Sequence, residues 1–259
     1  MKMKDNRVNQ KSESPLHFAR FEFKYVLPES KRFAVEKDMG YFVELDSFVA
    51  QQNGSQYHVR SLYYDDPALT CFYDKINGMC TRSKFRIRTY PTNARELSPV
   101  YLEIKGRHNN LVFKHRTRIE NVDSKWMTLT GGELSNAVAQ SNNNSRVMEQ
   151  FRFELARKRL SPITMIDYMR RPYVSKFNPG FRVTFDQALT ARRTDCLFPS
   201  DQTVAMKLIA GYTVLEVKFL HHLPSWFHRI IQVHELQRVS ISKICVGMET
   251  LGLAVDENG

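Results

Sequence analysis

The sequence of 259 residues contains no long apolar run. A membrane-spanning helix needs about 20 consecutive apolar residues, and no segment of the chain approaches that length. The N-terminal residues up to Ser14 are mostly polar and lack the apolar block that secretory signals carry. We therefore expect neither a membrane-spanning helix nor a secretory leader, and we expect the protein to be cytoplasmic.

Cysteine is scarce, and the glycine pattern of a common phosphate-binding loop is missing. The four cysteines are Cys71, Cys80, Cys196 and Cys245, and no two have the C-x-x-C spacing of a zinc or redox site. Free thiols in a reducing compartment are the expected state. No G-x-x-x-x-G-K segment occurs, which argues against a P-loop enzyme.

Positive charge is abundant. The chain has 38 Lys and Arg residues against 27 Asp and Glu, a formal net charge of +11. At 42% apolar and 25% charged residues, its composition is that of a globular protein. The surplus suggests a polyanionic partner, such as nucleic acid, an anionic membrane face or a phosphorylated small molecule. A basic surface without a partner would give the same composition, so the pattern of charges must decide.

The chain is expected to form one domain. Residues 1–16 form a polar tail without periodicity, which predicts disorder, and residues 17–255 form the domain, with an insert at about 121–145. Capping residues and spacing predict helices at about 28–45, 146–160, 224–237 and 242–251. Short alternating segments fill the rest, and many gaps between them are too short for parallel crossovers. The expected fold class is α+β with antiparallel strands.

The alternation places cations together on one face of each strand. In the segment 84–88, Lys84, Arg86 and Arg88 share one face, and Phe85 and Ile87 share the other. Segments 20–25, 101–105, 113–119, 181–186 and 215–219 repeat this scheme. Together the six polar faces carry eleven cations and four acids: Arg20, Lys24, Lys84, Arg86, Arg88, Lys105, Lys114, Arg116, Arg118, Arg182 and Lys218, with Glu22, Glu103, Asp186 and Glu216.

Two interpretations of these faces compete. An ordinary half-exposed sheet also alternates apolar and charged residues, but its wet face usually mixes both signs because like charges opposite one another destabilise a sheet. We therefore favour convergence of the cations on one anion-binding surface. If the sheet closes, it forms an antiparallel barrel with a charged lumen and with helices packed outside. The ratio of cations to acids suits several linked phosphates better than one.

Three acids have the same local setting. Glu22, Glu103 and Glu216 each precede a lysine by two residues on a predicted strand. Such a carboxylate can pair with neighbouring cations. It can also hold a divalent cation that bridges phosphate oxygens, because hard cations prefer carboxylate ligands. Both roles remain open at the level of the residues.

The order of these segments resembles the VTC domain, the polyphosphate polymerase domain of the triphosphate tunnel metalloenzymes, which are relatives of the CYTH proteins. The resemblance covers residues from about 18 to 250 and depends on nine segments in order. These are Phe21–Tyr25, Ser61–Asp65, Lys84–Arg88, Tyr101–Lys105, Lys114-x-Arg116, Tyr168-x-Arg170, Arg182–Asp186, Leu215–Lys218 and Ser242-Lys243.

The resemblance implies a tunnel that holds ATP and polyphosphate or triphosphate, with Mn2+ or Mg2+. In the polymerases, the γ-phosphate of ATP passes to a growing polyphosphate chain. The implied catalytic cations are Lys24, Arg86, Arg88, Lys105 and Arg170, and the implied phosphate-binding residues are Lys75, Lys114 and Lys243. The strand faces add Arg116, Arg182 and Lys218 to the phosphate-binding set. The implied metal ligand is Glu216, with Glu103 a weaker candidate and Glu22 a third.

Departures from the family pattern keep other functions open. The CYTH hydrolases open with Glu-x-Glu-x-Lys, whereas this chain has Arg20-x-Glu22-x-Lys24, which favours the polymerases. Ser240 stands where the family often has a basic residue. The alternatives are a triphosphatase and a non-catalytic polyphosphate-binding module. A closed lumen would exclude a nucleic acid duplex, and export of a product would need a membrane or protein partner.

Overall fold

The computed structural model describes residues 21–50, 55–90, 99–109, 111–119, 122, 126, 129–141, 145–199 and 203–256. The predicted tail at 1–16, Arg20 and part of the predicted insert at 121–145 lie outside these residues. Within the described part of the chain, no helix combines the length and apolar character needed to cross a membrane.

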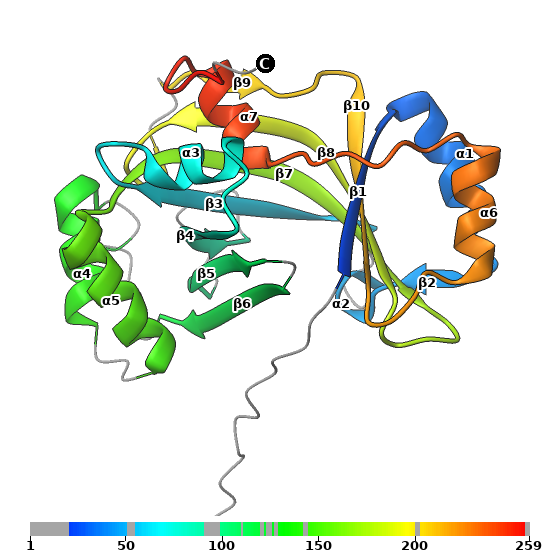
Figure 1. Cartoon of the computed structure of the whole chain (residues 1–259), viewed down its shortest axis with the longest axis horizontal. Helices are drawn as coiled ribbons and strands as arrows, with labels where there is room; N and C mark the ends of the chain where they lie inside the picture. The colour runs from blue at the N-terminus through cyan, green and yellow to red at the C-terminus, as the bar shows by residue number, and fades with distance from the viewer. Residues whose placement is uncertain are drawn as a thin grey trace, which may run out of the picture.

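Antiparallel strands build one large sheet (Figure 1). Its main path runs in the order β1-β10-β8-β7-β3-β4-β5-β6, while β2 pairs with β7 and β9 pairs with β8. The strands are β1 (Phe21–Pro28), β2 (Val43–Leu45), β3 (Tyr57–Asp65), β4 (Thr81–Thr89), β5 (Tyr101–His108), β6 (Leu111–Arg118), β7 (Ser161–Ser175), β8 (Arg182–Arg193), β9 (Met206–Lys207) and β10 (Tyr212–Phe219). The predicted α+β class with antiparallel strands is confirmed.

The sheet is strongly curved but open, so the prediction of a closed barrel is wrong. Strands β1 and β6 are its two edges, and they do not pair among the described residues. The physical reason lies at the edge of β1, which another segment already covers. The backbone N–H of Val239 donates to the carbonyl of Lys24 at 2.8 Å, and Arg238 bridges to Tyr25. We call residues 238–242 the roof segment; it crosses β1 between α6 and α7 (Figure 1).

The helices are α1 (Glu29–Met39), α2 (Ser47–Ala50), α3 (Thr70–Ile76), α4 (Gly131–Gln140), α5 (Arg146–Lys158), α6 (Ser225–Val233) and α7 (Lys243–Thr250). The predicted helices at 146–160 and 242–251 match α5 and α7, and their caps Ser145 and Ser242 accept from backbone N–H groups three residues on. The other two predicted helices were too long. In particular, the predicted run to residue 45 ends at Met39, and β2 follows.

Three apolar clusters hold the helices on the sheet. Strands β3, β4 and β5 pack their outer face against α4 and α5, around Ile87, Leu102 and Phe151. Strands β1, β8 and β10 pack against α1 and α6. The third cluster joins β3, β7 and β8 to α7, with Ile166 and Met248 buried in it. Figure 1 shows α4 and α5 at one side, α1 and α6 at the other, and α3 beside α7.

The period of two along each strand separates these apolar clusters from the charged face. In β4, Phe85 and Ile87 are fully buried against the α5 side, while Arg86 and Arg88 point the opposite way and line a cavity. The same division holds along β10, where Leu215 and Val217 are buried in the cluster with α6 and Glu216 faces the cavity. Packing of the apolar face therefore fixes the direction of the charged face.

The contact between Gly106 in β5 and Phe113 in β6 gives a test of this packing. The two residues are register partners, and a Cβ atom at Gly106 would lie 1.9 Å from Cζ of the Phe113 ring. Because the ring would have to move, we expect Gly106→Ala to lower the free energy of unfolding by about 1–3 kcal/mol in urea denaturation.

Gly132→Ala is the matched control, because nothing lies within 4 Å of the Cβ position in α4. That variant should unfold at the same urea concentration as the wild type or slightly higher, since alanine is the better helix former. Equal unfolding midpoints for the two variants would show that the Phe113 ring does not cover Gly106.

Candidate anion-binding site

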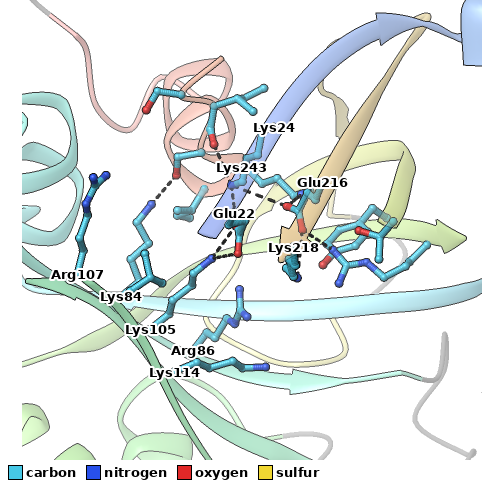
Figure 2. A pocket seen from close by; sticks show the side chains of 18 of the residues that line it. Glu22, Lys24, Lys84, Arg86, Lys105, Arg107, Lys114, Glu216, Lys218 and Lys243 are labelled. Carbon is cyan, nitrogen blue, oxygen red and sulfur yellow. Dashed lines mark hydrogen bonds and ion pairs between the residues drawn. The ribbon is translucent and has the colours of Figure 1, made fainter. Parts of the chain in front are cut away.

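The concave face of the sheet encloses a cavity of about 960 Å³. Every strand on the main path of the sheet contributes to it, together with α3, the roof segment and α7. Fourteen cationic side chains line it: Lys24, Lys75, Arg82, Lys84, Arg86, Arg88, Lys105, Arg107, Lys114, Arg170, Arg182, Lys218, Arg238 and Lys243. Only three acidic residues do so among the described residues, namely Glu22, Asp46 and Glu216. Figure 2 shows many of these side chains converging from different elements.

Most of the residues singled out in the sequence meet here. Of the five predicted catalytic cations all line the cavity, as do five of the six predicted phosphate-binding residues. The exception is Arg116, whose guanidinium stacks 3.4 Å from the ring centroid of Tyr101 and donates to the hydroxyl of Tyr90. Of the predicted metal ligands, Glu22 and Glu216 line the cavity and Glu103 does not.

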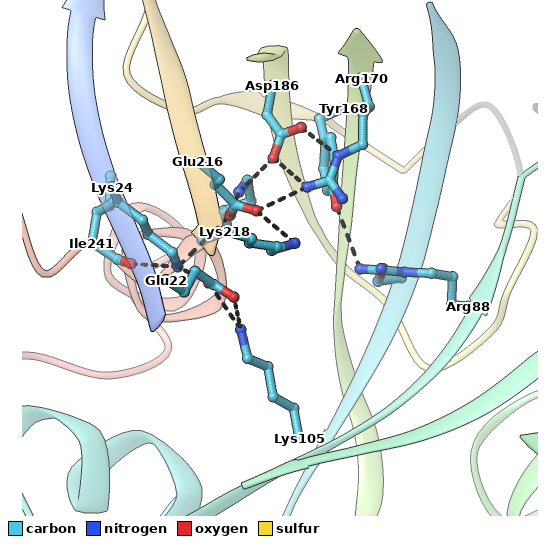
Figure 3. A network of polar contacts seen from close by, with 12 residues as sticks. Glu22, Lys24, Arg88, Lys105, Tyr168, Arg170, Asp186, Glu216, Lys218 and Ile241 are labelled. Atoms are coloured by element: carbon cyan, nitrogen blue, oxygen red, sulfur yellow. Dashed lines mark hydrogen bonds and ion pairs between the residues drawn. The ribbon is translucent and has the colours of Figure 1, made fainter. Parts of the chain in front are cut away.

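Two buried carboxylates organise one wall of the cavity (Figure 3). Asp186 in β8 receives two hydrogen bonds of 2.7 Å from the guanidinium of Arg170 in β7, and Lys243 Nζ lies 2.7 Å away. Glu216 in β10 lies 2.7 Å from Lys243 Nζ and 3.2 Å from Arg170 Nη2. Burial alone would raise the pKa of both carboxyls, but these cations hold the pKa values below the ordinary range.

Glu103 organises the opposite wall. It is fully buried and contacts cations from two strands: Arg86 at 2.5 Å, Lys114 at 2.7 Å, Arg116 at 3.5 Å and Arg88 at 3.7 Å. Its burial would raise the pKa of its carboxyl, yet Arg86, Arg88 and Lys114 keep that pKa far below its usual value. Glu103 therefore acts as a fixed anion beneath the cavity surface, and its oxygens are already engaged.

The two walls meet across an ion pair. Glu22 in β1 accepts from Lys105 Nζ in β5 at 3.0 and 3.1 Å, and Lys24 Nζ lies 3.5 Å from the same carboxylate. Strands β1 and β5 are far apart in the order of the sheet, so this contact spans the cavity. It closes the charged surface where backbone pairing does not.

Across β4, β5 and β6, three lysines lie side by side on the cavity face with no acidic residue between them in the register. Lys84, Lys105 and Lys114 are register partners in a row across β4, β5 and β6. Like charges in that arrangement destabilise a sheet. Burial lowers the pKa of Lys105 to about 8 despite its contact with Glu22. The local potential also acts on Tyr63, because burial would raise its pKa but Arg86, Arg88 and Lys84 lower it to about 8.

The roof segment is held down by lysines. Lys24 Nζ donates to the carbonyl of Ile241 at 3.1 Å, and Lys84 Nζ donates to Ser242 Oγ at 2.5 Å. Lys75 in α3 reaches across to Ser240 Oγ at 3.1 Å. Lys75, one of the predicted phosphate-binding residues, therefore places a cation beside Ser240 from another element.

Four cations of the cavity were not in the predicted site: Lys84, which the sequence had placed only on a charged strand face, and Arg82, Arg107 and Arg238. Arg82 lies two residues before Lys84, and Arg107 lies two residues after Lys105, on the same strand faces. The predicted strands 84–88 and 101–105 were too short to include them. Arg238 belongs to the roof segment and stacks over Phe23. No periodic pattern in the sequence marks it.

Oxygen donors suitable for a divalent cation are few. No cluster of three or more His, Cys, Asp or Glu side chains suited to a metal occurs among the described residues. Glu22 and Glu216 face the cavity from neighbouring strands, and Thr184 lies opposite Glu216 in the register. The buried Thr184 hydroxyl has no hydrogen-bond partner in the described structure. This donor set fits a cation shared with a ligand's oxygens, since Mg2+ typically takes one or two carboxylates plus phosphates.

The structure thus consists of an open, curved antiparallel sheet around a cation-lined cavity. The family model of the VTC domain matches residues 19–252, and the chain belongs to this family, as the sequence pattern indicated. No curated protein matches the chain.

Two solved structures are similar to the chain. A protein from Bacillus halodurans described as a candidate adenylate cyclase is 11% identical, with a TM-score of 0.51 over 86% of this chain and 95% of that one. A protein from Pyrococcus horikoshii OT3 is 12% identical, with a TM-score of 0.47 over 89% of this chain and 98% of that one. At such low identity, the first likeness bears on the fold alone.

The buried carboxylates give a test of the wall around Arg170. Removing the negative charge of Asp186 leaves the positive charges of Arg170 and Lys243 buried with one carboxylate fewer to neutralise them. We expect Asp186→Asn to lower the free energy of unfolding by about 3–5 kcal/mol, measured by urea denaturation.

Glu154→Gln provides the control on the outer face. Glu154 pairs with Arg157, whose side chain is 52% exposed, and such pairs contribute about 1 kcal/mol or less. A loss for Asp186→Asn no larger than for Glu154→Gln would contradict the assigned role of Asp186.

Proposed function

We propose that the protein is an ATP-dependent phosphotransferase of the polyphosphate polymerase type. The cavity would bind the triphosphate of ATP and a polyphosphate chain, together with a divalent metal ion. The observation that carries this proposal is the lining of fourteen cations and three acids on rigid strands. A charge surplus of this size suits a ligand with several linked phosphates, and membership of the VTC family points the same way.

The residues fit what phosphoryl transfer demands of a protein. The reaction requires in-line positioning and neutralisation of charge on the equatorial phosphate oxygens. Arg86, Arg88 and Arg170 offer forked donors to phosphate, while Lys24 and Lys243 act as point charges. Because carboxylates beneath the surface already orient these cations, little reorganisation is needed when the charge develops.

The proposed step conserves atoms and charge. A terminal oxygen of the polyphosphate chain attacks the γ-phosphorus of ATP, and the bond from that phosphorus to the β,γ-bridging oxygen breaks. ADP leaves, and the chain is one phosphate longer. The cations on both walls of the cavity would hold donor and acceptor in line and repel neither.

A divalent ion would be held by Glu216 and Glu22 together with phosphate oxygens, with the Thr184 hydroxyl close to Glu216. When bound, such an ion neutralises charge on the phosphates and orients them. The protein side chains bind the remaining oxygens. Manganese and magnesium both suit these oxygen donors.

A product assay tests the proposal. The protein is incubated with ATP and Mn2+, and ADP and polyphosphate length are measured. We expect chain growth with the wild type, and we expect Arg88→Ala to lower the rate by about 10²–10³-fold because it removes one preorganised donor. Glu216→Gln should also be strongly impaired while remaining folded. Arg157→Ala, which removes an exposed arginine on α5, should have the rate of the wild type.

The other outcomes have distinct meanings. Release of orthophosphate from ATP or tripolyphosphate without elongation would identify a triphosphatase, in which water replaces the polyphosphate acceptor. Tight binding without turnover would identify a binding module. Full activity of either Arg88→Ala or Glu216→Gln would show that its assigned role is wrong.

The pKa of Lys105 predicts how binding depends on pH. In the free protein burial lowers this pKa to about 8, and a bound polyanion would favour the protonated form. Burial likewise lowers the pKa of Lys114 in the cavity to about 7. The affinity for inorganic tripolyphosphate should therefore be highest below about pH 7 and fall above it, by up to about tenfold per pH unit for each lysine. Titration calorimetry at several pH values measures this. Charged groups around Lys105 are Glu22, Lys24, Glu216, Lys218, Lys84 and Lys114.

Lys105→Arg is the matched control because its guanidinium stays protonated throughout this range. The variant should bind tripolyphosphate at pH 7, and its affinity should decline less steeply than that of the wild type between pH 8 and pH 9, because only Lys114 still loses a proton. An equal decline in the wild type and in Lys105→Arg would assign the pH dependence to another group.

A further inference from the structure

The cavity has two chemically different ends. The register of β4 and β5 orders four rows along it: Arg88 with Tyr101, Arg86 with Glu103, Lys84 with Lys105, and Arg82 with Arg107. The last two of these rows have only cations, and Figure 2 shows Arg107 beside Lys84 at that side. On β3, Ser61 lies opposite Arg88, which belongs to the first row. Tyr57 precedes Ser61 by four residues on this antiparallel strand, so it lies beyond the first row, at the end of the cavity opposite to Arg82.

Tyr57 is an aromatic surface at the other end. It lines the cavity and is the register partner of Arg170. Its ring makes edge contacts with Phe48 and Tyr90, with centroids 5.3 and 5.7 Å apart and interplanar angles of 84° and 69°, so two neighbouring rings support it. Phe48 is about half exposed, which places this cluster at the surface.

Two of the other three cavity tyrosines are already engaged by cations, and the third, Tyr173, packs edge-on against Phe185 with ring centroids 6.1 Å apart. Arg86 lies 5.5 Å over the ring of Tyr63, and Arg170 and Lys243 lie 5.2 and 5.1 Å over the ring of Tyr168. Within the described residues, no cation lies over the ring of Tyr57. Because Tyr57 also lines the cavity and is only partly buried, part of its ring is open to a ligand.

The charge at this end differs too. Asp46 lines the cavity here, and its backbone N–H donates to the carbonyl of Pro172, another lining residue, at 3.1 Å. Its carboxylate accepts from the backbone of Phe48 and lies 4.0 Å from Arg182. A carboxylate repels phosphate but accepts hydrogen bonds from hydroxyl and amino groups. An uncharged ligand group with such donors suits this position better than a further phosphate.

We propose that Tyr57 is the stacking surface for the base of a nucleoside triphosphate, with Asp46 beside the nucleoside. The phosphates then run past Arg170 toward Arg82 and Arg107. This proposal deepens the proposed function and rests on it, because it names the nucleotide as ligand and gives its direction in the cavity. Stacking accepts any base, so it selects nucleotides over inorganic tripolyphosphate rather than one base over another.

Titration calorimetry with ATP and with inorganic tripolyphosphate, in EDTA to prevent turnover, tests the subsite. The variants are Tyr57→Leu, Tyr57→Phe and Tyr90→Leu. We expect Tyr57→Leu to weaken ATP binding by about 5- to 150-fold and to change tripolyphosphate binding by less than about twofold. Tyr57→Phe keeps the ring and should bind both ligands like the wild type. Tyr90→Leu belongs to the same cluster but does not line the cavity, so its ratio of the two affinities should match the wild type.

The outcomes separate this inference from the proposed function. If the wild type binds neither ligand in EDTA and also gives no turnover of ATP with Mn2+, the proposed function fails. If the wild type binds both, and Tyr57→Leu weakens both equally or leaves both unchanged, the base subsite is wrong although the anion-binding cavity stands. The ratio of the affinities for ATP and tripolyphosphate could also change equally in Tyr90→Leu and Tyr57→Leu. That result would assign the effect to the aromatic cluster as a whole and overturn the role of Tyr57.

Discussion

The structure depends on holding many positive charges close together on one concave surface. A sheet normally avoids like charges opposite one another, yet here lysines face lysines across β4, β5 and β6. Three deeply placed carboxylates, Glu103, Asp186 and Glu216, offset part of this repulsion. Each contacts several cations from more than one element, so each joins strands as well as charges.

These carboxylates also decide where the cations point. A guanidinium that is fixed by two hydrogen bonds to Asp186 keeps one orientation, and its remaining N–H groups point in fixed directions. The apolar clusters on the outer face provide the other half of the constraint, because they prevent the strands from turning. Burial on one side and ion pairing on the other thus produce a surface that is organised before any ligand arrives.

Much of this arrangement could be predicted from the sequence, because a strand's period of two assigns each side chain to a face. Phe85 and Ile87 define the buried face of β4, and Arg86 and Arg88 must then share the opposite one. Closure of the sheet could not be predicted in this way. It depends on which segment reaches the edge of β1, and the roof segment that does so has no alternation to identify it.

The contacts between particular side chains could not be predicted from the sequence either. The sequence marks Glu103 as an acid among cations, but only the fold shows that four cations surround it and that it lies beneath the cavity surface. Likewise, only the fold shows that Lys75, from a helix far away in the sequence, lies beside Ser240. Long-range register and side-chain reach determine such contacts, and neither is encoded in a local pattern.

The contact between Glu22 and Lys105 has a mechanical consequence. Neighbouring strands from β1 through to β6 are joined by backbone ladders, whereas the two walls meet here through side chains alone. The width of the cavity at this contact is therefore adjustable. A ligand that draws the ammonium of Lys105 away from Glu22 can widen the cavity without breaking any backbone hydrogen bond between strands.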